Sequence, residues 1–120
     1  MESQDPDRAR LTLEGIRAEA ASRVAAAEAA LAALMHDRES ANDDDEHDPD
    51  GVTLSAEWSR LSGLADAARA ELRQVDDALA RTAAGVYGVC VDCGRPIPPA
   101  RLAIRPFAER CVPCAEKRGR

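Results

Sequence analysis

Two long segments with small apolar residues at helical spacing constrain the fold of this chain more than any other feature. Between about Asp7 and Asp37 there is no Pro and one Gly, and from about Thr53 to Ala84 the apolar residues alternate steps of four and three. This spacing predicts two long helices, each with one narrow apolar stripe. The first stripe is Leu13, Ile16, Ala20, Val24, Ala27, Leu31 and Leu34, and the second is Leu54, Trp58, Leu61, Ala65, Ala68, Leu72, Val75 and Leu79.

The two stripes match one another as antiparallel partners. Residues that face each other across an antiparallel hairpin have numbers with a constant sum, and six pairs share the sum 92, with Ile16 and Val75 one short of it. The pairs are Leu13 with Leu79, Ala20 with Leu72, Val24 with Ala68, Ala27 with Ala65, Leu31 with Leu61 and Leu34 with Trp58. The sequence therefore predicts an all-α chain built on a long antiparallel two-helix coiled-coil hairpin over residues 1–84. Thr53 is expected to cap the second helix and Gly85 to end it.

The loop expected at about residues 38–52 is strongly acidic. Residues 37–50 hold eight acids and one arginine, and Pro49 and Gly51 disfavour helix. Two interpretations stay open: a solvated linker, or an anionic tip directed at a metal or a basic partner.

Composition limits the kind of protein this can be. The chain has 120 residues and is 45% hydrophobic, mostly through alanine, with one Trp, one Tyr and one Phe, which suits thin helical packing. We expect a cytoplasmic protein, since no apolar run is long enough for a membrane span and the N-terminus lacks the layout of a signal peptide. The net charge of −6 disfavours binding to DNA and favours a protein partner.

Four cysteines in two closely spaced pairs predict a zinc site. Cys90 and Cys93 are separated by two residues, as are Cys111 and Cys114, with seventeen residues between the pairs. This spacing is typical of tetrahedral four-thiolate zinc, and reduced thiols are expected in the cytoplasm. Because four thiolates leave no open coordination position, the zinc is predicted to be structural and not catalytic.

The remaining residues of the segment 85–120 predict a small zinc finger with a short C-terminal helix or tail. Gly94 is expected to take a positive φ in the first turn. The predicted miniature core is Ile97, Leu102, Ile104 and Phe107, with Tyr87 packed beside it. Arg95, Arg101, Arg105 and Arg110 are expected to balance the negative thiolates. The tail Lys117–Arg120 is interpreted as a solvated end, with a nucleic-acid clamp as the alternative.

The segment Gly85–Pro98, together with Arg101-Leu102 and Arg105–Cys114, closely resembles the C4 zinc finger of the DksA/TraR family. The resemblance covers both cysteine pairs, their spacing and the Ile-Pro, Arg-Leu and Arg-Pro elements between them. It implies a bacterial transcription regulator that binds RNA polymerase directly and inserts its hairpin into the secondary channel, without binding promoter DNA. It also implies that acidic tip residues act near the catalytic magnesium region of the polymerase.

The same resemblance assigns roles to individual residues. The family's tip motif, Asp-x-x-Asp-x-Ala, falls on residues 47–52, where Asp50 matches, Asp48 stands in for the first acid and Val52 replaces Ala. Asp45, Asp48 and Asp50 are therefore the predicted tip contacts. Some members bind the alarmone ppGpp through basic residues, whose places here hold Gln74 and Ala115, with Arg105 retained. We expect weak or absent dependence on ppGpp.

Two other classes of function are alternatives to a polymerase-binding regulator. A zinc finger that contacts nucleic acid or another protein through Arg95, Arg101 and Arg105 is the alternative. An enzyme is not expected, because His36 and His47 have no nucleophile beside them in a recognisable motif. The chain is expected to be a monomer.

Overall fold

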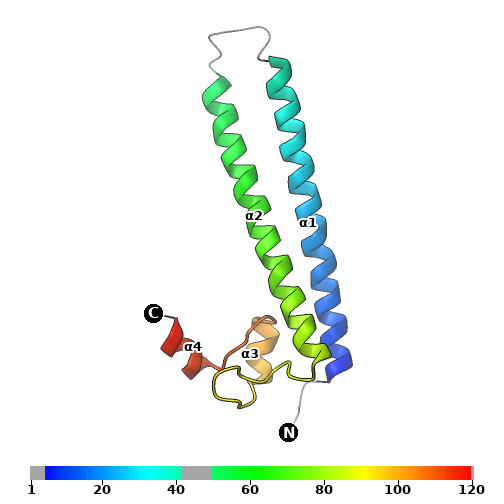
Figure 1. Cartoon of the computed structure of the whole chain (residues 1–120), viewed down its shortest axis with the longest axis vertical. Coiled ribbons are helices and arrows are strands. Elements are labelled where there is room, and N and C mark those ends of the chain that lie inside the picture. Colours follow the sequence, from blue (N-terminus) through cyan, green and yellow to red (C-terminus); the bar gives the residue numbers. More distant parts are fainter. Residues whose placement is uncertain (1–4, 42–49, 120) are drawn as a thin grey trace. The chain divides into compact units, whose positions relative to one another are not determined.

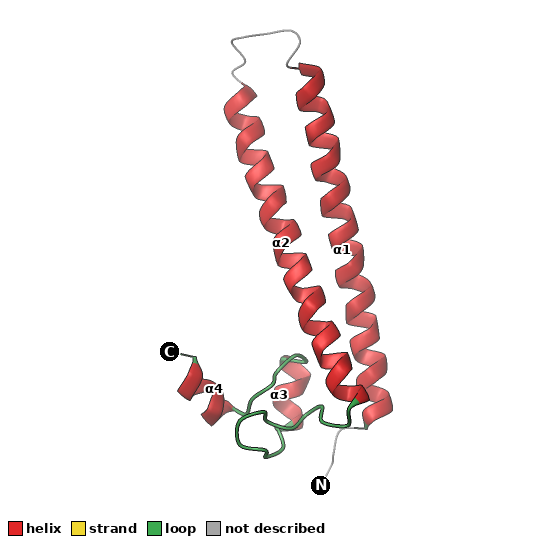
Figure 2. Cartoon of the chain, viewed as in Figure 1, coloured by secondary structure: helices red, strands yellow, loops and turns green. Residues whose placement is uncertain are grey.

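The structure, a computed structural model, describes residues 5–41 and 50–119. These residues form four helices: α1 (Pro6–Ala41), α2 (Asp50–Ala83), α3 (Pro99–Ile104) and α4 (Val112–Arg118) (Figures 1 and 2). Within these ranges there is no strand, only an isolated antiparallel bridge between Val89 and Pro96. The predicted all-α class is confirmed. None of the described helices combines the length and the apolar character needed to cross a membrane.

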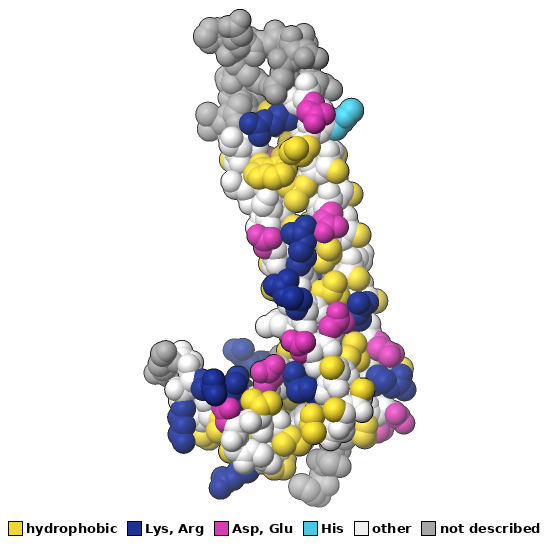
Figure 3. Space-filling model, in the orientation of Figure 1, with side chains coloured by type: hydrophobic (Ala, Val, Ile, Leu, Met, Phe, Trp, Pro, Cys, Tyr) yellow, Lys and Arg dark blue, Asp and Glu magenta, His cyan; other side chains and the backbone are white. Residues whose placement is uncertain are grey.

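Ion pairs between α1 and α2 fix their relative direction. Arg17 pairs with Asp76, Arg23 with Glu71 and Glu28 with Arg69, so residue numbers rise along α1 as they fall along α2. The helices are therefore antiparallel, as predicted. Figure 3 shows basic and acidic side chains interspersed along the visible face of these helices. Ion pairs between exposed side chains of this kind add little to the stability of the fold.

Burial along the two helices follows the predicted stripes, with additions. The buried residues are Ala9, Leu13, Ala20 and Ala27 on α1 and Leu61, Ala65, Ala68, Val75 and Ala78 on α2. Alanine dominates because its small side chain lets the helix axes approach closely. Ala9 and Ala78 were not predicted. The stripe residues Ile16, Val24, Leu31 and Leu72 are only half-buried.

The N-terminus of α2 differs from the sequence prediction, and its C-terminus agrees with it. α2 begins at Asp50, before the expected cap Thr53. At its C-terminus Gly85 has φ +78° and donates its N–H to the Thr82 carbonyl, while the Val86 N–H reaches the Arg81 carbonyl at 2.9 Å. This is a Schellman ending, which requires the positive φ that glycine allows.

Trp58 departs from its predicted place in the seam. It remains 37% exposed, and Met35 on α1 is 43% exposed. A large side chain in a two-helix hairpin has no third element to cover its outer face, which explains the partial exposure.

The chain forms two compact units that are described separately. One holds the start of α1 up to Arg17 together with the chain from Arg73 onward, and the other holds Ala18–Leu72. The zinc finger lies in the first unit with the last turns of α2. The division into a hairpin of residues 1–84 and a finger of residues 85–120 stays a prediction.

Candidate metal centre

The four cysteines come together in one cluster. Their Sγ atoms all lie within 4.8 Å of one another, and the Sγ atoms of Cys93 and Cys111 are 3.7 Å apart. Zinc–sulfur bonds of about 2.3 Å in a tetrahedron place neighbouring sulfurs about 3.8 Å apart. A disulfide would need about 2.05 Å. The donor set and spacing therefore fit one zinc ion held by Cys90, Cys93, Cys111 and Cys114, with all four tetrahedral positions filled by thiolate.

The first cysteine pair is shaped by backbone hydrogen bonds. The Gly94 N–H bonds to the Cys90 carbonyl at 2.9 Å, and the Cys90 N–H bonds to the Arg95 carbonyl at 2.8 Å. Gly94 has φ +76°, as predicted from the turn. The Cys93 N–H points to Cys90 Sγ at 3.5 Å, the arrangement that stabilises a thiolate.

The second cysteine pair opens a helix. Cys111 is the N-cap of α4 and Cys114 lies in its first turn, with Pro113 at one of the first two positions. The Ala115 N–H closes the turn on the Cys111 carbonyl at 2.9 Å. Proline is favoured there because its missing N–H would lack a partner anyway. Between the pairs, the Val91 N–H bonds to the Glu109 carbonyl at 2.9 Å, so the two segments are joined through the backbone as well.

The core of the finger is smaller than predicted. Cys90, Ile97 and Leu102 are buried, and Tyr87, Ala108, Cys111 and Cys114 pack against them. Ile97, Leu102 and Tyr87 were predicted correctly, but Ile104 is 80% exposed and Phe107, half-buried, lies outside this cluster. Residues two apart on a helix point about 200° apart. Once Leu102 faces inward, Ile104 faces outward.

An acid between the first two cysteines connects the two halves of the site. Asp92 Oδ2 accepts hydrogen bonds from Arg110 Nε at 2.7 Å and from Arg118 Nε at 3.2 Å. Hydrogen bonding from Arg110, followed by the charges of both arginines, lowers the pKa of Asp92. Arg110 precedes Cys111, and Arg118 ends α4. Asp92 and Arg118 were missed by sequence reasoning, although an acid inside one cysteine pair and an arginine beside the other are a visible signal.

The other arginines predicted around the metal have different places. Arg101 Nε donates to the Arg110 carbonyl at 2.9 Å and so supports the second pair. Arg95 and Arg105 are exposed, and neither side chain forms a hydrogen bond or ion pair within residues 5–41 and 50–119.

The thiols differ in their ease of ionisation before metal is bound. Desolvation raises the pKa of Cys90, but hydrogen bonds from the backbone of Cys93, Cys111 and Asp92 outweigh it and bring the pKa to about 6. The pKa of Cys114 is raised to about 12, first by its hydrogen bond with Cys111. Zinc binds the deprotonated sulfur, so metal uptake releases protons from this cluster.

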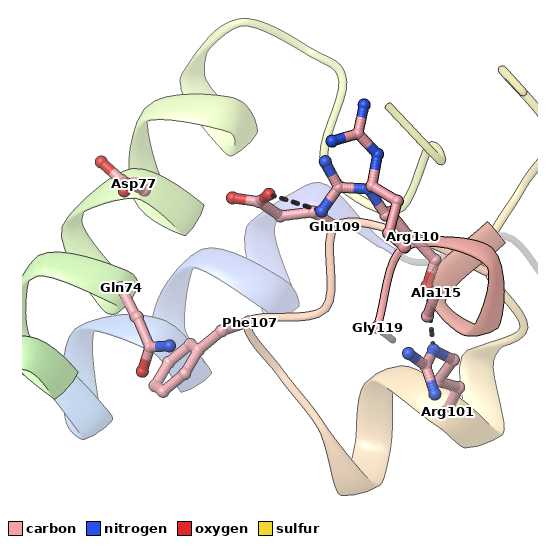
Figure 4. A pocket seen from close by; sticks show the side chains of 9 residues that line it. Gln74, Asp77, Arg101, Phe107, Glu109, Arg110, Ala115 and Gly119 are labelled. Atoms are coloured by element: carbon pink, nitrogen blue, oxygen red, sulfur yellow. Dashed lines mark hydrogen bonds and ion pairs between the residues drawn. The ribbon is translucent and has the colours of Figure 1, made fainter. Parts of the chain in front are cut away.

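A cavity of about 520 Å³ lies between the last turns of α2 and the finger. Figure 4 shows Gln74 and Asp77 on α2, with Phe107, Glu109 and Arg110 on the segment that precedes α4. Its remaining lining residues are Arg101, Ala115, Arg118 and Gly119. Gln74 and Ala115, which the resemblance pairs with basic ppGpp-binding residues, thus line one cavity. Arg105 does not line it.

The predicted tip residues fall at the limit of the described chain. Asp45 and Asp48 lie outside the described residues, and Asp50 is the first residue of α2. Their role stays a prediction.

A helical hairpin joined to a four-cysteine finger defines a class of zinc-finger protein. Residues 85–119 match the family described as prokaryotic dksA/traR C4-type zinc finger. The fold is similar to that of the transcription factor DksA2 from Pseudomonas aeruginosa, with a TM-score of 0.79 and 26% identity, covering 95% of this chain and 82% of that one. Residues 85–119 are therefore a DksA/TraR-type C4 zinc finger, and the chain has a DksA-like fold.

A second relative matches a smaller part of the chain. An uncharacterised protein of Aquifex aeolicus (strain VF5) is 40% identical over 57 residues, which is 48% of this chain and 39% of the relative. The match thus spans about two fifths of that relative's length.

Proposed function

We propose that this protein is a bacterial transcription regulator that binds RNA polymerase through the secondary channel, with its acidic hairpin tip near the active site. The observation that carries the proposal is the likeness of fold to a transcription factor, DksA2, over 95% of the chain. The matching finger at residues 85–119 adds to it. Two long antiparallel helices, joined by an acidic stretch of sequence, suit insertion into a narrow channel.

The residues proposed to act on the polymerase are Asp45, Asp48 and Asp50. Carboxylates are hard oxygen ligands that interact with Mg²⁺ and with the basic groups around it. Eight acids in residues 37–50, from the end of α1 to the first residue of α2, supply this charge. Such a tip would change the stability of initiation complexes by electrostatics, without chemistry of its own.

The finger is proposed to have a structural role at the base of the helices. Zinc held by four thiolates supplies no open position for water, so the protein is proposed not to be an enzyme. The four cysteines would hold the ion and thereby fix Tyr87, Leu102 and α4. A net charge of −6 supports a protein partner over direct, sequence-specific DNA binding. We propose a cytoplasmic monomer that meets its partner there.

We further propose that ppGpp has little or no influence on this protein. The cavity that holds Gln74 and Ala115 also carries the carboxylates of Asp77 and Glu109. Its arginines are already engaged: Arg110 and Arg118 by Asp92, and Arg101 by a backbone carbonyl. A polyphosphate would have to compete with these contacts and with two acids.

Binding to purified core polymerase and in vitro transcription, with and without ppGpp, test the proposal. The full chain with Asp45, Asp48 and Asp50 all changed to Asn should lose its effect on transcription and bind more weakly. The control carries three amide substitutions on exposed acids of α1, Asp7→Asn, Glu14→Gln and Glu19→Gln, and should behave as the wild type. Equal activity of the tip variant and the wild type would remove the tip from the mechanism.

A further inference from the structure

Arg81, in the last turn of α2, contacts the segment that leads into the second cysteine pair. Its Nη1 donates to Glu109 Oε2 at 3.1 Å, and its Nη2 donates to the Phe107 carbonyl at 3.4 Å. The Arg81 side chain is 15% exposed, whereas the arginines that form ion pairs between α1 and α2 are 40% to 51% exposed. Solvent and salt therefore screen the contact of Arg81 less than they screen those pairs.

Glu109 lies two residues before Cys111 and touches both halves of the zinc site. Its backbone carbonyl accepts a hydrogen bond from the N–H of Val91, which lies between the first two cysteines, at 2.9 Å. Its Oε1 lies 3.6 Å from Nη1 of Arg110 (Figure 4), and Nε of the same arginine donates to Asp92. A displacement of Glu109 therefore reaches the backbone or side chains beside both cysteine pairs.

The segment that carries Glu109 depends on such contacts for its position. Residues 105–111, between α3 and α4, form no helix or strand, so no regular ladder of backbone hydrogen bonds holds them. The Tyr87 hydroxyl donates to the Pro106 carbonyl at 2.9 Å, and Arg81 supplies two further hydrogen bonds. Arg81 belongs to α2 and not to the finger, so one of the long helices takes part in placing the third zinc ligand.

We propose that Arg81 is a positioning residue of the zinc site, which acts through Glu109 to keep the second cysteine pair beside the first. Four thiolates bind one ion only when the two pairs are close together. A contact that favours this arrangement therefore stabilises the zinc-bound protein more than the zinc-free protein. Such coupling is reciprocal, so zinc bound by the finger also stabilises the end of α2. The inference goes beyond the proposed function, since it involves no partner protein.

The zinc affinity of the full chain, measured by competition with a chromophoric chelator, tests the proposal. We expect Arg81→Met to lower the affinity about fivefold or more, the lower end of couplings between two sites. Arg81→Lys keeps the positive charge and should restore part of the affinity. Arg73→Met is the control, because Arg73 is exposed on the same helix and forms no hydrogen bond or ion pair within residues 5–41 and 50–119. Equal zinc affinities of Arg81→Met and Arg73→Met would overturn the proposal.

A double variant separates action through Glu109 from a general loss of stability. Glu109→Gln alone should lower zinc affinity as well. Because the two side chains act as one unit, Arg81→Met combined with Glu109→Gln should bind zinc about as weakly as the weaker of the two single variants. If the two losses multiply in the double variant, the side chains act independently and the proposal is overturned. Circular dichroism of the zinc-bound proteins identifies a variant that fails to fold, and Arg81→Lys and Glu109→Gln, the mildest changes, then decide the test.

Amide hydrogen exchange at the end of α2 measures the reciprocal effect. The N–H groups of Ala84 and Gly85 donate to carbonyls of the last turn of α2 at 3.0 Å and 3.1 Å. Removal of zinc from the wild type should speed exchange at both, and Arg81→Met should show faster exchange there even with zinc bound. The buried Val75, two turns earlier, should exchange as before. Unchanged exchange at Ala84 and Gly85 on zinc removal would overturn the coupling. Polymerase takes no part in these measurements, so their failure leaves the proposed function standing.

Discussion

The Asp92 carboxylate accepts a hydrogen bond from Arg110 Nε at 2.7 Å, and this contact joins the two halves of the zinc site. Asp92 lies between the first two cysteines, and Arg110 immediately precedes the third. Arg118, beyond the fourth cysteine, donates to the same carboxylate at 3.2 Å. The Asp92 side chain thus contacts residues on both sides of the second cysteine pair. It also holds two positive charges close to the four thiolates.

Loss of this carboxylate should weaken zinc binding. We expect Asp92→Asn to lower zinc affinity roughly tenfold, the lower end of the effect of residues that orient metal ligands. Competition with a chromophoric chelator measures the affinity, and cobalt substitution reports the thiolate geometry. Glu116→Gln removes one negative charge from an exposed position on α4 and serves as the control. Equal affinities of the two variants would contradict the role assigned to Asp92.

Removal of zinc should unfold the finger and leave the two long helices largely intact. Among residues 85–119 only Cys90, Ile97 and Leu102 are buried, too few to offset the conformational entropy of the finger without metal. We expect a strong chelator to broaden or collapse the amide NMR signals of residues 85–119, while far-ultraviolet circular dichroism keeps most of its helical signal. Added zinc should restore the spectrum and added magnesium should not. Persistent, dispersed signals from the metal-free finger would refute this expectation.

Truncation of a buried side chain between α1 and α2 should lower the free energy of unfolding, whereas truncation of an exposed one should not. Leu13 is 1% exposed and Leu11 is 62% exposed on the same helix. Leu13→Ala should lower the free energy of unfolding by about 2–5 kcal/mol, because it leaves a cavity. Leu11→Ala should change it by less than about 0.5 kcal/mol. Urea denaturation of both variants measures the difference, and similar midpoints would show that the seam does not carry the stability.

The sequence was sufficient for the parts of the fold that repeat. The match between the two stripes predicted the antiparallel direction of the helices, and the cysteine spacing predicted the metal cluster, because both depend on regular local geometry. The burial of individual side chains was harder to predict. Ile104 and Trp58 were assigned to cores that are too thin to cover them, and which way a residue of a six-residue helix points depends on where that helix docks. The Asp92 contacts join residues 18 and 26 positions apart, so helical periodicity does not reveal them, and their only sequence signal is the place of these charges beside the two cysteine pairs.

Tyr87 supplies a hydrogen bond that can be removed without changing the shape of the finger. Its hydroxyl donates to the Pro106 carbonyl at 2.9 Å. Tyr87→Phe should lower the stability of the zinc-bound protein by about 0.5–1.5 kcal/mol at pH 7. Burial raises the pKa of Tyr87 above its ordinary value of 10.0. The extra stability of the wild type over Tyr87→Phe is therefore complete below pH 10 and is lost as the pH rises through the raised pKa of Tyr87. Thermal melting of both proteins at pH 7 and above pH 10 measures this, and a constant difference would contradict it.

The cavity at the base of α2 offers a gain-of-function test of the proposed indifference to ppGpp. Gln74 and Ala115 line it from α2 and α4, at the places where the resemblance expects basic residues. Gln74→Lys combined with Ala115→Lys would add two positive charges to a lining that holds three arginines and two acids, and so strengthen its attraction for a polyphosphate. In transcription with polymerase, we expect this variant to respond to ppGpp where the wild type does not. Gln74→Leu with Ala115→Leu, which changes size without charge, should stay unresponsive. A wild-type response as large as that of the lysine variant would show that the existing arginines already bind the alarmone.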